Sequence, residues 1–497
     1  SVTNALWLLQ TLGVGTMAAA AVRSLFARRR SVLILLAGGL VAPLLALMTF
    51  VLFAGSAARS GPEGSFRMFG RTLSREWVWF AIAAGMLFVF YRVSDQTTWS
   101  IHPFYKRRLC SAFALRRVRR PGGAVAAQQL SYDALQSLSR YRPRCWYTPH
   151  VCDPKRPHEC AEPTKCAHDC RRWPELVICA AANVSDEGAT PPGRNSVSFS
   201  FTSSDIGGPR IGWIQTDDME KALGARRVRD ITMPAAVAIS GAAISPAMGK
   251  MTRRPIGPLV ALANVRLGVW LPHPLWVKEL RSRTTQDWID RPRVIYLLKE
   301  IFGRYRLNDR FLYVTDGGHW ENLGMVELLR RGCTEIYCFD ASGDDVDTFF
   351  TLGEAVALAR TELGVEIEID PEPMKPPAGT EGGDGAESKR AARAPTDHVP
   401  GRFSYPNGVT GRLVFAKAAV TDGAPWDVRA YADFDDQFPT HSTLDQLYTD
   451  KKFEAYRALG AFAARNAVAA MKENGRGRVS TPHVGTAQRR RPTPRRR

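Results

Sequence analysis

The sequence predicts an α/β fold preceded by transmembrane α-helices. Two observations support this prediction: a long apolar run near the N-terminus, and short apolar segments beyond residue 100 that alternate with helical patterns. With 497 residues, 45% of them hydrophobic, the chain has enough apolar material for both a buried core and membrane segments.

Residues 1–99 form the predicted membrane region, with two to three spans. Residues 31–57 are nearly uncharged and, at about 1.5 Å per residue, long enough to cross a hydrocarbon core of roughly 30 Å. Residues 77–91 are shorter, but their aromatic ends suit the two membrane interfaces. Residues 5–22 are a third span or, alternatively, an amphipathic or core helix.

The charge of the chain favours an anionic partner. There are 67 Lys and Arg against 48 Asp and Glu, a net charge of +19, and basic runs flank the predicted spans. By the positive-inside rule, this predicts an integral membrane protein with its soluble domain on the cytoplasmic side, although the basic loop at 58–76 opposes that orientation. No nucleic-acid-binding motif is present, so we expect an anionic phospholipid surface and no nucleic acid; protein partners are not predicted.

Residues 100–370 are predicted to be the main part of the α/β domain. Four apolar runs are candidate strands: residues 176–182, 294–298, 311–315 and 335–340. Residues 326–331 and 352–363 have apolar residues at helical spacing, so strands and helices alternate.

The remaining segments differ in composition. Residues 371–401 are dense in Pro, Gly, Ala and charge, which predicts a flexible insertion. Residues 402–474 are predicted to complete the α/β domain, and residues 475–497 a disordered basic tail.

The most informative motif contains Asp316, which follows the candidate strand at 311–315 and precedes Gly317 and Gly318. An acid at the carboxyl end of a strand lies where α/β folds gather their chemistry, and paired glycines permit a tight turn. From the pattern alone, an ordinary strand-to-helix turn with an Asp cap is the alternative.

The motif resembles the Asp-Gly-Gly motif of patatin-like phospholipases, in the long bacterial form that continues as His, an aromatic residue and Glu-Asn-Leu-Gly. The resemblance covers much of the chain from Ser100 onward. It also includes the segments at 101–105, 181–184, 191–194 and 438–443.

This resemblance implies a three-layer α/β domain that hydrolyses membrane lipid acyl esters with a serine–aspartate dyad and no cofactor. Asp316 would be the base, and a glycine-rich loop would supply backbone N–H groups to the oxyanion. The other motif residues would shape or support the turn: Gly317, Gly318, His319, Glu321 and Asn322.

Ser240 is the one candidate nucleophile that we single out, in a sequence similar to a degraded Gly-x-Ser-x-Gly elbow. A helix is the better prediction here, because Asp230 or Thr232 can cap it, Pro234 suits its first turn and Pro246 ends it. By resemblance, too, this segment is a packing helix and not the catalytic elbow.

The nucleophile is therefore expected upstream of Ser1, since residues 1–233 contain neither the oxyanion loop nor the elbow. Two alternatives remain: Ser240 as the nucleophile, or a non-catalytic, membrane-anchored scaffold or lipid-binding protein of the same fold.

A second unusual feature is a Cys/His-rich insertion at residues 145–170. Its five cysteines lack a Cys-x-x-Cys pair, so reduced, unligated thiols are the simplest interpretation and a structural zinc site is the alternative. The cysteines are Cys145, Cys152, Cys160, Cys166 and Cys170.

Overall fold

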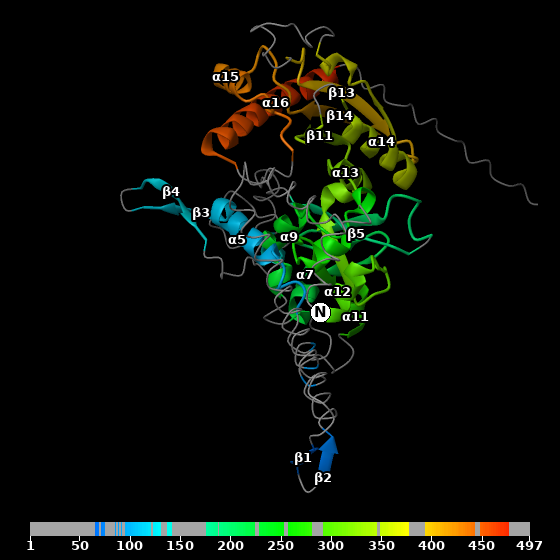
Figure 1. The fold of residues 1–497 in the computed structure, drawn as a ribbon. Coiled ribbons are helices and arrows are strands. Elements are labelled where there is room, and N and C mark those ends of the chain that lie inside the picture. The colour runs from blue at the N-terminus through cyan, green and yellow to red at the C-terminus, as the bar shows by residue number, and fades with distance from the viewer. Residues whose placement is uncertain are drawn as a thin grey trace, which may run out of the picture. The chain divides into compact units, whose positions relative to one another are not determined.

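The computed structural model has mixed α/β architecture in two compact units, Ser1–Trp320 (the first unit) and Glu321–Arg497 (the second unit) (Figure 1). The predicted fold class is thereby confirmed at this level. The structure describes residues 65–68, 71–74, 85, 88, 91, 95–120, 123–130, 137–141, 175–186, 188–223, 228–252, 257–280, 292–344, 348–376, 393–442 and 448–476.

Several predicted segments lie outside the described residues: 5–22, 31–57, most of 77–91, the Cys/His-rich insertion 145–170, and 477–497. A short antiparallel hairpin of β1 (Ser65–Met68) and β2 (Arg71–Ser74) lies between two of the predicted spans. Within the described ranges, no helix combines the length and the apolar character that crossing a bilayer requires.

The first unit is built on a six-stranded sheet in which all neighbouring strands are antiparallel. In spatial order, its strands are β8 (Gly212–Gln215), β7 (Asp205–Gly208), β6 (Ser196–Phe201), β5 (Ile178–Asn183), β10 (Phe311–Asp316) and β9 (Val269–Pro272).

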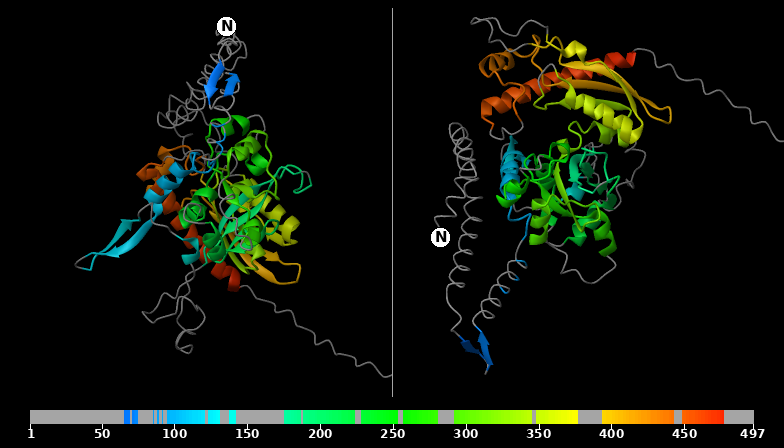
Figure 2. Two further views of the ribbon diagram at one scale, coloured as in Figure 1. Left: turned by 90° about the horizontal axis from the view of Figure 1, so that it is seen from below. Right: turned by 45° about the vertical axis from the view of Figure 1, so that its right-hand side comes forward.

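Helices and a two-stranded ribbon complete the first unit (Figure 2). The helices are α5 (His102–Phe113), α7 (Thr216–Ala222), α9 (Met233–Ser240), α10 (Gly257–Leu262), α11 (Pro274–Leu280) and α12 (Val294–Ile301). Strands β3 (Leu115–Arg119) and β4 (Val125–Gln129) form the ribbon. Helix α9 packs on β5 and β10, and α5 packs on α9.

Strand β10 is buried on both faces of the sheet. Leu312 and Val314 belong to the larger hydrophobic core, whereas Phe311 and Tyr313 point into an aromatic cluster with Trp270. Alternating side chains along a strand point to opposite faces, so this pattern requires packed layers above and below β10. Because β10 is packed on both faces, the core fixes the position of Asp316 at the end of this strand.

The sequence predicted the start of α9 well. Thr232 is its N-cap, with the side chain accepting a hydrogen bond from the Ala235 N–H at 3.4 Å, and Pro234 lies in the first turn. Ser240 is the last helical residue, well before Pro246. A side-chain oxygen at the N-cap and a proline in the first turn both suit helix initiation.

The predicted strand at 294–298 is wrong, because this segment is the helix α12. Its β-branched and aromatic residues favoured a strand, but the residues buried on one side are Tyr296 and Glu300, four positions apart. This spacing lies on one face of a helix, where tertiary contacts outweigh local β-propensity.

The second unit contains a four-stranded sheet with its own helices. Its strands in spatial order are β11 (Glu335–Asp340), β14 (Thr410–Lys417), β13 (His398–Ser404) and β12 (Glu366–Ile369), with only β11 and β14 parallel. Its helices are α13 (Met325–Arg330), α14 (Phe350–Leu363), α15 (Trp426–Phe434) and α16 (Asp450–Arg476). Ala467 and Met471 of α16 pack on Val414 and Ala416.

Two predicted boundaries need correction. The predicted domain at 100–370 contains the division between the units, since β10 pairs with β5 and β9 while β11 pairs with β14. The predicted insertion at 371–401 is too long: β13 begins at His398, and Gly401 pairs with Ile369 on β12 and Leu413 on β14. The composition that predicts an insertion applies to residues 377–392, whereas the residues from His398 onward form a strand.

A buried ion pair joins α12 to the rest of the first unit. Arg266 Nη1 lies 3.1 Å from Glu300 Oε2, and both side chains are fully buried. The other carboxylate oxygen accepts a hydrogen bond from Trp270 Nε1 at 2.6 Å, and Arg266 Nη2 donates to the Gln96 carbonyl at 2.7 Å. Gln96, which follows the predicted span at 77–91, is thus tied to the core.

We expect Arg266→Met to lower the free energy of unfolding by about 3–5 kcal/mol, because it leaves the Glu300 carboxylate buried without its cation. Denaturant titration followed by tryptophan fluorescence measures this. The double variant Arg266→Met/Glu300→Gln, which removes the charge but keeps an acceptor for Trp270, should recover a large part of the loss. Equal destabilisation of the two variants would contradict the role given to the charge.

Candidate functional site

The candidate site lies at the carboxyl end of β10, where Asp316 ends the strand and the turn η5 (Gly317–His319) begins. Asp316 pairs with Ala180 on β5, an inner strand of the sheet. The carboxylate is therefore held by a central strand rather than by an isolated loop.

A hydrogen bond and a close backbone contact define the turn after Asp316. Asp316 Oδ1 accepts a hydrogen bond from the Gly318 N–H at 2.7 Å. A Cβ atom at Gly317 would lie only 2.9 Å from the Cys179 carbonyl oxygen, so a larger residue would force the turn away from β5. The glycine after the aspartate is thus required by packing.

The environment of Asp316 favours its protonated form. Burial raises the pKa of Asp316 from 3.8 to about 6, and the bond from Gly318 opposes only part of this rise. No charged side chain of the described residues contributes to the shift. At neutral pH the group is ionised but close to its pKa, which is the condition for an efficient general base.

A chain of buried hydrogen bonds supports the turn. Asn183 Nδ2 donates to Thr315 Oγ1 at 2.9 Å, and Thr315 Oγ1 lies 2.8 Å from His319 Nδ1. The Gly249 N–H donates to Asn183 Oδ1 at 2.9 Å. His319 also bonds to the Ala243 backbone, yet burial still lowers the pKa of His319 to about 4. The imidazole is therefore neutral and held in place by these bonds.

Ser240 reaches this region from the end of α9. Its hydroxyl donates a hydrogen bond of 2.7 Å to the Cys179 carbonyl, the same group that closely approaches Gly317. In the described structure Ser240 and Asp316 share no hydrogen bond. The serine is thus near the turn, with its proton directed to the backbone of β5.

Tyr105 is a site residue that the sequence analysis did not single out. Its hydroxyl donates to the Gly241 carbonyl at 3.2 Å, and a Cβ atom at Gly241 would come within 2.9 Å of that hydroxyl. Burial raises the pKa of Tyr105, and the negative charge of Asp316 adds to the rise. The only sequence feature that pointed to Tyr105 was its place in the segment 101–105, which is part of the family resemblance.

The second half of the motif belongs to the second unit and starts α13. Glu321 is buried, and its carboxylate accepts hydrogen bonds from the Leu323 and Val326 N–H groups at 2.6 and 3.3 Å. Asn322 is exposed. A carboxylate at the start of a helix satisfies otherwise unpaired N–H groups, so Glu321 has a structural role.

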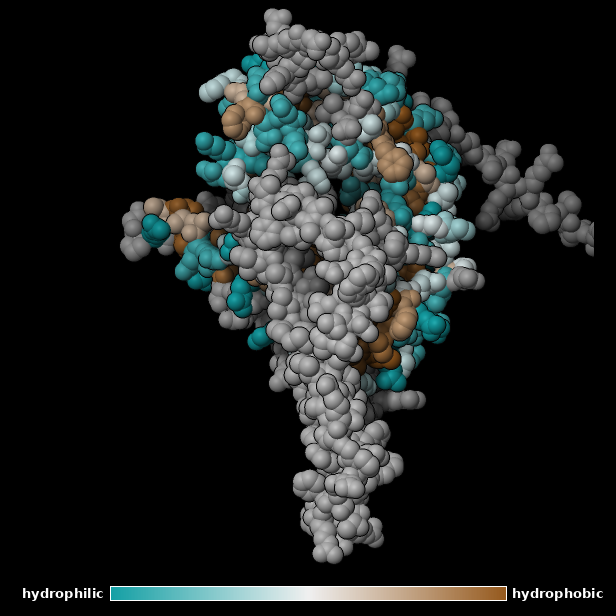
Figure 3. All heavy atoms as spheres, viewed as in Figure 1, coloured by the Kyte–Doolittle hydropathy of each residue, from teal (hydrophilic) through white to brown (hydrophobic). Residues whose placement is uncertain are grey.

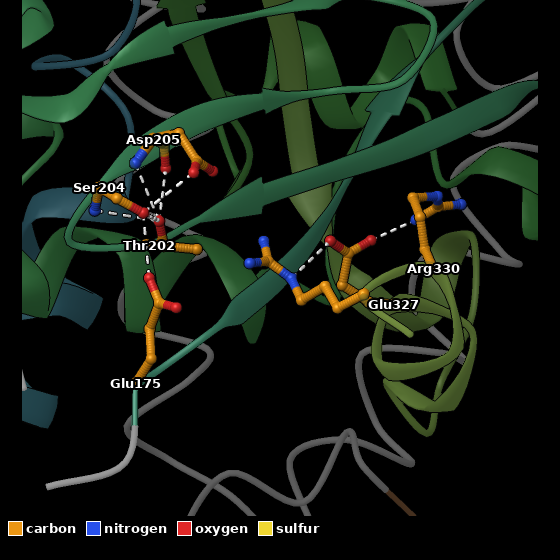
Figure 4. Close-up of polar contacts among 7 residues, drawn as sticks. Glu175, Thr202, Ser204, Asp205, Glu327 and Arg330 are labelled. Atoms are coloured by element: carbon orange, nitrogen blue, oxygen red, sulfur yellow. Dashed lines mark hydrogen bonds and ion pairs between the residues drawn. The ribbon is translucent and has the colours of Figure 1, made fainter. Parts of the chain in front are cut away.

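Two other carboxylate clusters stabilise local structure (Figure 4). Ser204 Oγ donates to Glu175 Oε1 at 3.0 Å and lies 2.9 Å from the carboxylate of the residue that follows it, within the turn between β6 and β7. Glu327 on α13 accepts hydrogen bonds from Arg330 and, at 3.1 Å, from Arg331. We assign the first cluster to the turn and the second to the end of α13.

Comparison with known proteins adds no further constraint on the site. No protein-family model matches the chain, and no similar sequence is found among curated proteins.

Within the part of the chain that the structure describes, no group of three or more His, Cys, Asp or Glu side chains is arranged to hold a metal ion. No disulfide joins the described cysteines Cys110, Cys179, Cys333 and Cys338 to one another.

The raised pKa of Asp316 predicts a pH-dependent cost to stability. Because the folded-state pKa lies above the unfolded one, the cost is absent below about pH 4, grows as the pH rises to about 6, and then stays near 3 kcal/mol, at about 1.36 kcal/mol for each pKa unit.

Asp316→Asn keeps an acceptor oxygen for the Gly318 N–H but cannot ionise. We expect this variant to be more stable than the parent by up to about 3 kcal/mol at about pH 8, and equal to it at about pH 3.5. Paired denaturation curves at the two pH values measure the difference. A difference that does not change with pH would show that the Asp316 carboxylate is not destabilised by burial.

Proposed function

We propose that the chain supplies the carboxylate base of a patatin-like lipid acyl hydrolase, a three-layer α/β enzyme attached to membrane helices and acting on membrane lipid at the cytoplasmic face. The observation that carries the proposal is Asp316 itself: a half-buried carboxylate at the end of a central strand, with a pKa raised to about 6 and no cation of the described residues contributing to that shift. A structural carboxylate in such a position would be expected to have a counter-ion, as Glu300 has.

In the proposed reaction Asp316 takes the proton of a serine hydroxyl as the serine oxygen bonds to the ester carbonyl carbon. The resulting oxyanion is stabilised by backbone N–H groups, and its collapse breaks the ester bond while Asp316 returns the proton to the departing alcohol. Water then releases the acid from the acyl-enzyme by the same route. His319 takes no part in the proton relay, since its neutral imidazole bonds to Thr315 and the Ala243 backbone.

The nucleophile in this proposal is the serine expected upstream of Ser1. The geometry of Ser240 favours a packing role instead, because its hydroxyl donates to the Cys179 carbonyl at the end of a capped helix. A fluorophosphonate probe, which labels activated serines covalently, identifies the nucleophile by mass spectrometry of the labelled peptide.

For the chain with its expected upstream segment, we predict that Asp316→Asn lowers the rate of lipid ester hydrolysis by on the order of a thousandfold or more, because the serine loses its base. In the parent, the rate should be half-maximal near pH 6 and reach a plateau roughly one pH unit higher, since the ionised carboxylate is the active form.

The matched control is Asp422→Asn, which neutralises an exposed carboxylate in the second unit and should leave the rate unchanged. If Asp316→Asn hydrolyses the ester as fast as the parent, Asp316 is not the base. If the parent neither hydrolyses esters nor reacts with the probe, the non-catalytic scaffold is the better description.

We predict that Ser240→Ala keeps both ester hydrolysis and probe labelling, and lowers the free energy of unfolding by about 1 kcal/mol through the lost bond to Cys179. Denaturation curves and the labelling assay on the same preparation separate the two effects. Loss of labelling in a folded Ser240→Ala variant would instead identify Ser240 as the nucleophile.

A further inference from the structure

The β3–β4 ribbon forms a two-stranded sheet of its own in the first unit. It follows α5 directly, its two strands pair from Leu115 with Gln129 to Arg119 with Val125, and no third described strand joins them. Figures 1 and 2 show it projecting from the end of α5. An isolated two-stranded hairpin is marginally stable in water, so a partner surface would stabilise it.

The charge on this element has one sign. Residues 101–131 contain seven Lys and Arg and no Asp or Glu. Lys106 is buried and donates a hydrogen bond of 3.0 Å to the Arg229 carbonyl, whereas Arg107, Arg108, Arg116 and Arg120 are exposed. The exposed surface of α5 and the ribbon is therefore positive and suits an anionic partner.

Exposed apolar side chains accompany these arginines. Phe113 is 62% exposed, Leu115 and Val125 are each 50% exposed, and Phe104 on α5 is 48% exposed. Figure 3 shows hydrophobic and hydrophilic residues side by side on the ribbon. Leaving such apolar area in water is unfavourable.

The combination distinguishes between anionic partners. A phosphate-binding surface for nucleic acid needs the arginines but gains nothing from exposed Leu115 and Val125. A phospholipid surface uses both, because guanidinium groups bind headgroup phosphates while apolar side chains enter the upper acyl region.

We propose that the exposed face of α5 and the β3–β4 ribbon, together the α5–ribbon surface, dock on an anionic phospholipid surface. Phe113, Leu115 and Val125 enter the interface, while Arg116 and Arg120 contact headgroup phosphates. This docking does not depend on the chemistry of Asp316 and holds whether or not the chain is a hydrolase.

The test is hydrogen–deuterium exchange of the full chain in nanodiscs of phosphatidylcholine, with and without phosphatidylglycerol. Since a predicted membrane anchor would hold the chain on both discs, the readout is local: exchange of the ribbon amides at 114–129. We expect exchange at least roughly fivefold slower in the discs with phosphatidylglycerol, the effect of about one arginine–headgroup contact, and the difference should vanish at high salt.

Arg116→Glu/Arg120→Glu should abolish this difference. The matched control Arg402→Glu/Arg465→Glu makes the same change in net charge at exposed positions of the second unit. It should retain the difference in ribbon exchange between the two kinds of nanodisc. Exchange in β5 and β10 reports whether each variant is folded. Equal ribbon exchange in both lipids would overturn the proposal, as would protection by an RNA oligonucleotide and not by phosphatidylglycerol.

Discussion

The hydrogen-bond chain from Asn183 through Thr315 to His319 is the constraint on which the candidate site depends. It ties β5, β10 and η5 together in a part of the first unit that water does not reach, where an unpaired polar group is costly. Ser196 on β6 adds a hydrogen bond of 2.9 Å to the His319 carbonyl. These hydrogen bonds hold the turn after Asp316 in one arrangement, so the carboxylate projects from a rigid backbone.

The two most informative carboxylates of the first unit differ in their neighbours. Burial raises the pKa of Glu300 and that of Asp316; among the described residues, Arg266 opposes the rise at Glu300, whereas a backbone N–H is what opposes it at Asp316. Glu300 is thus a structural carboxylate held in an ion pair, whereas burial destabilises the ionised form of Asp316. Proteins commonly retain such a cost where a group must exchange protons during function.

The sequence predicted those features that local chemistry decides. The strand before Asp316, its glycine turn and the capped helix that contains Ser240 all follow from neighbouring residues, and the structure has all three, with the helix ending at Ser240 rather than just before Pro246. The helix α12 was misassigned because its buried side follows from tertiary packing around Glu300.

Long-range pairings could not be read from the chain. The assignment of β10 and β11 to separate sheets depends on hydrogen bonds with strands such as β5 and β14, which are distant in sequence. For the same reason Tyr105 was missed as a neighbour of Asp316, more than two hundred residues away. The patatin-like assignment remains a proposal that rests on the motif around Asp316.

Under the two proposals, helix α5 would serve two functions at once. Tyr105 bonds to the Gly241 carbonyl and its pKa is raised by the charge of Asp316, while the neighbouring Phe104 is exposed on the α5–ribbon surface. A rigid helix transmits small displacements along its length, and shifts of about 1 Å are enough to change a reaction rate substantially. The state of the lipid surface would then act as an allosteric effector, coupling membrane composition to the geometry around the carboxylate.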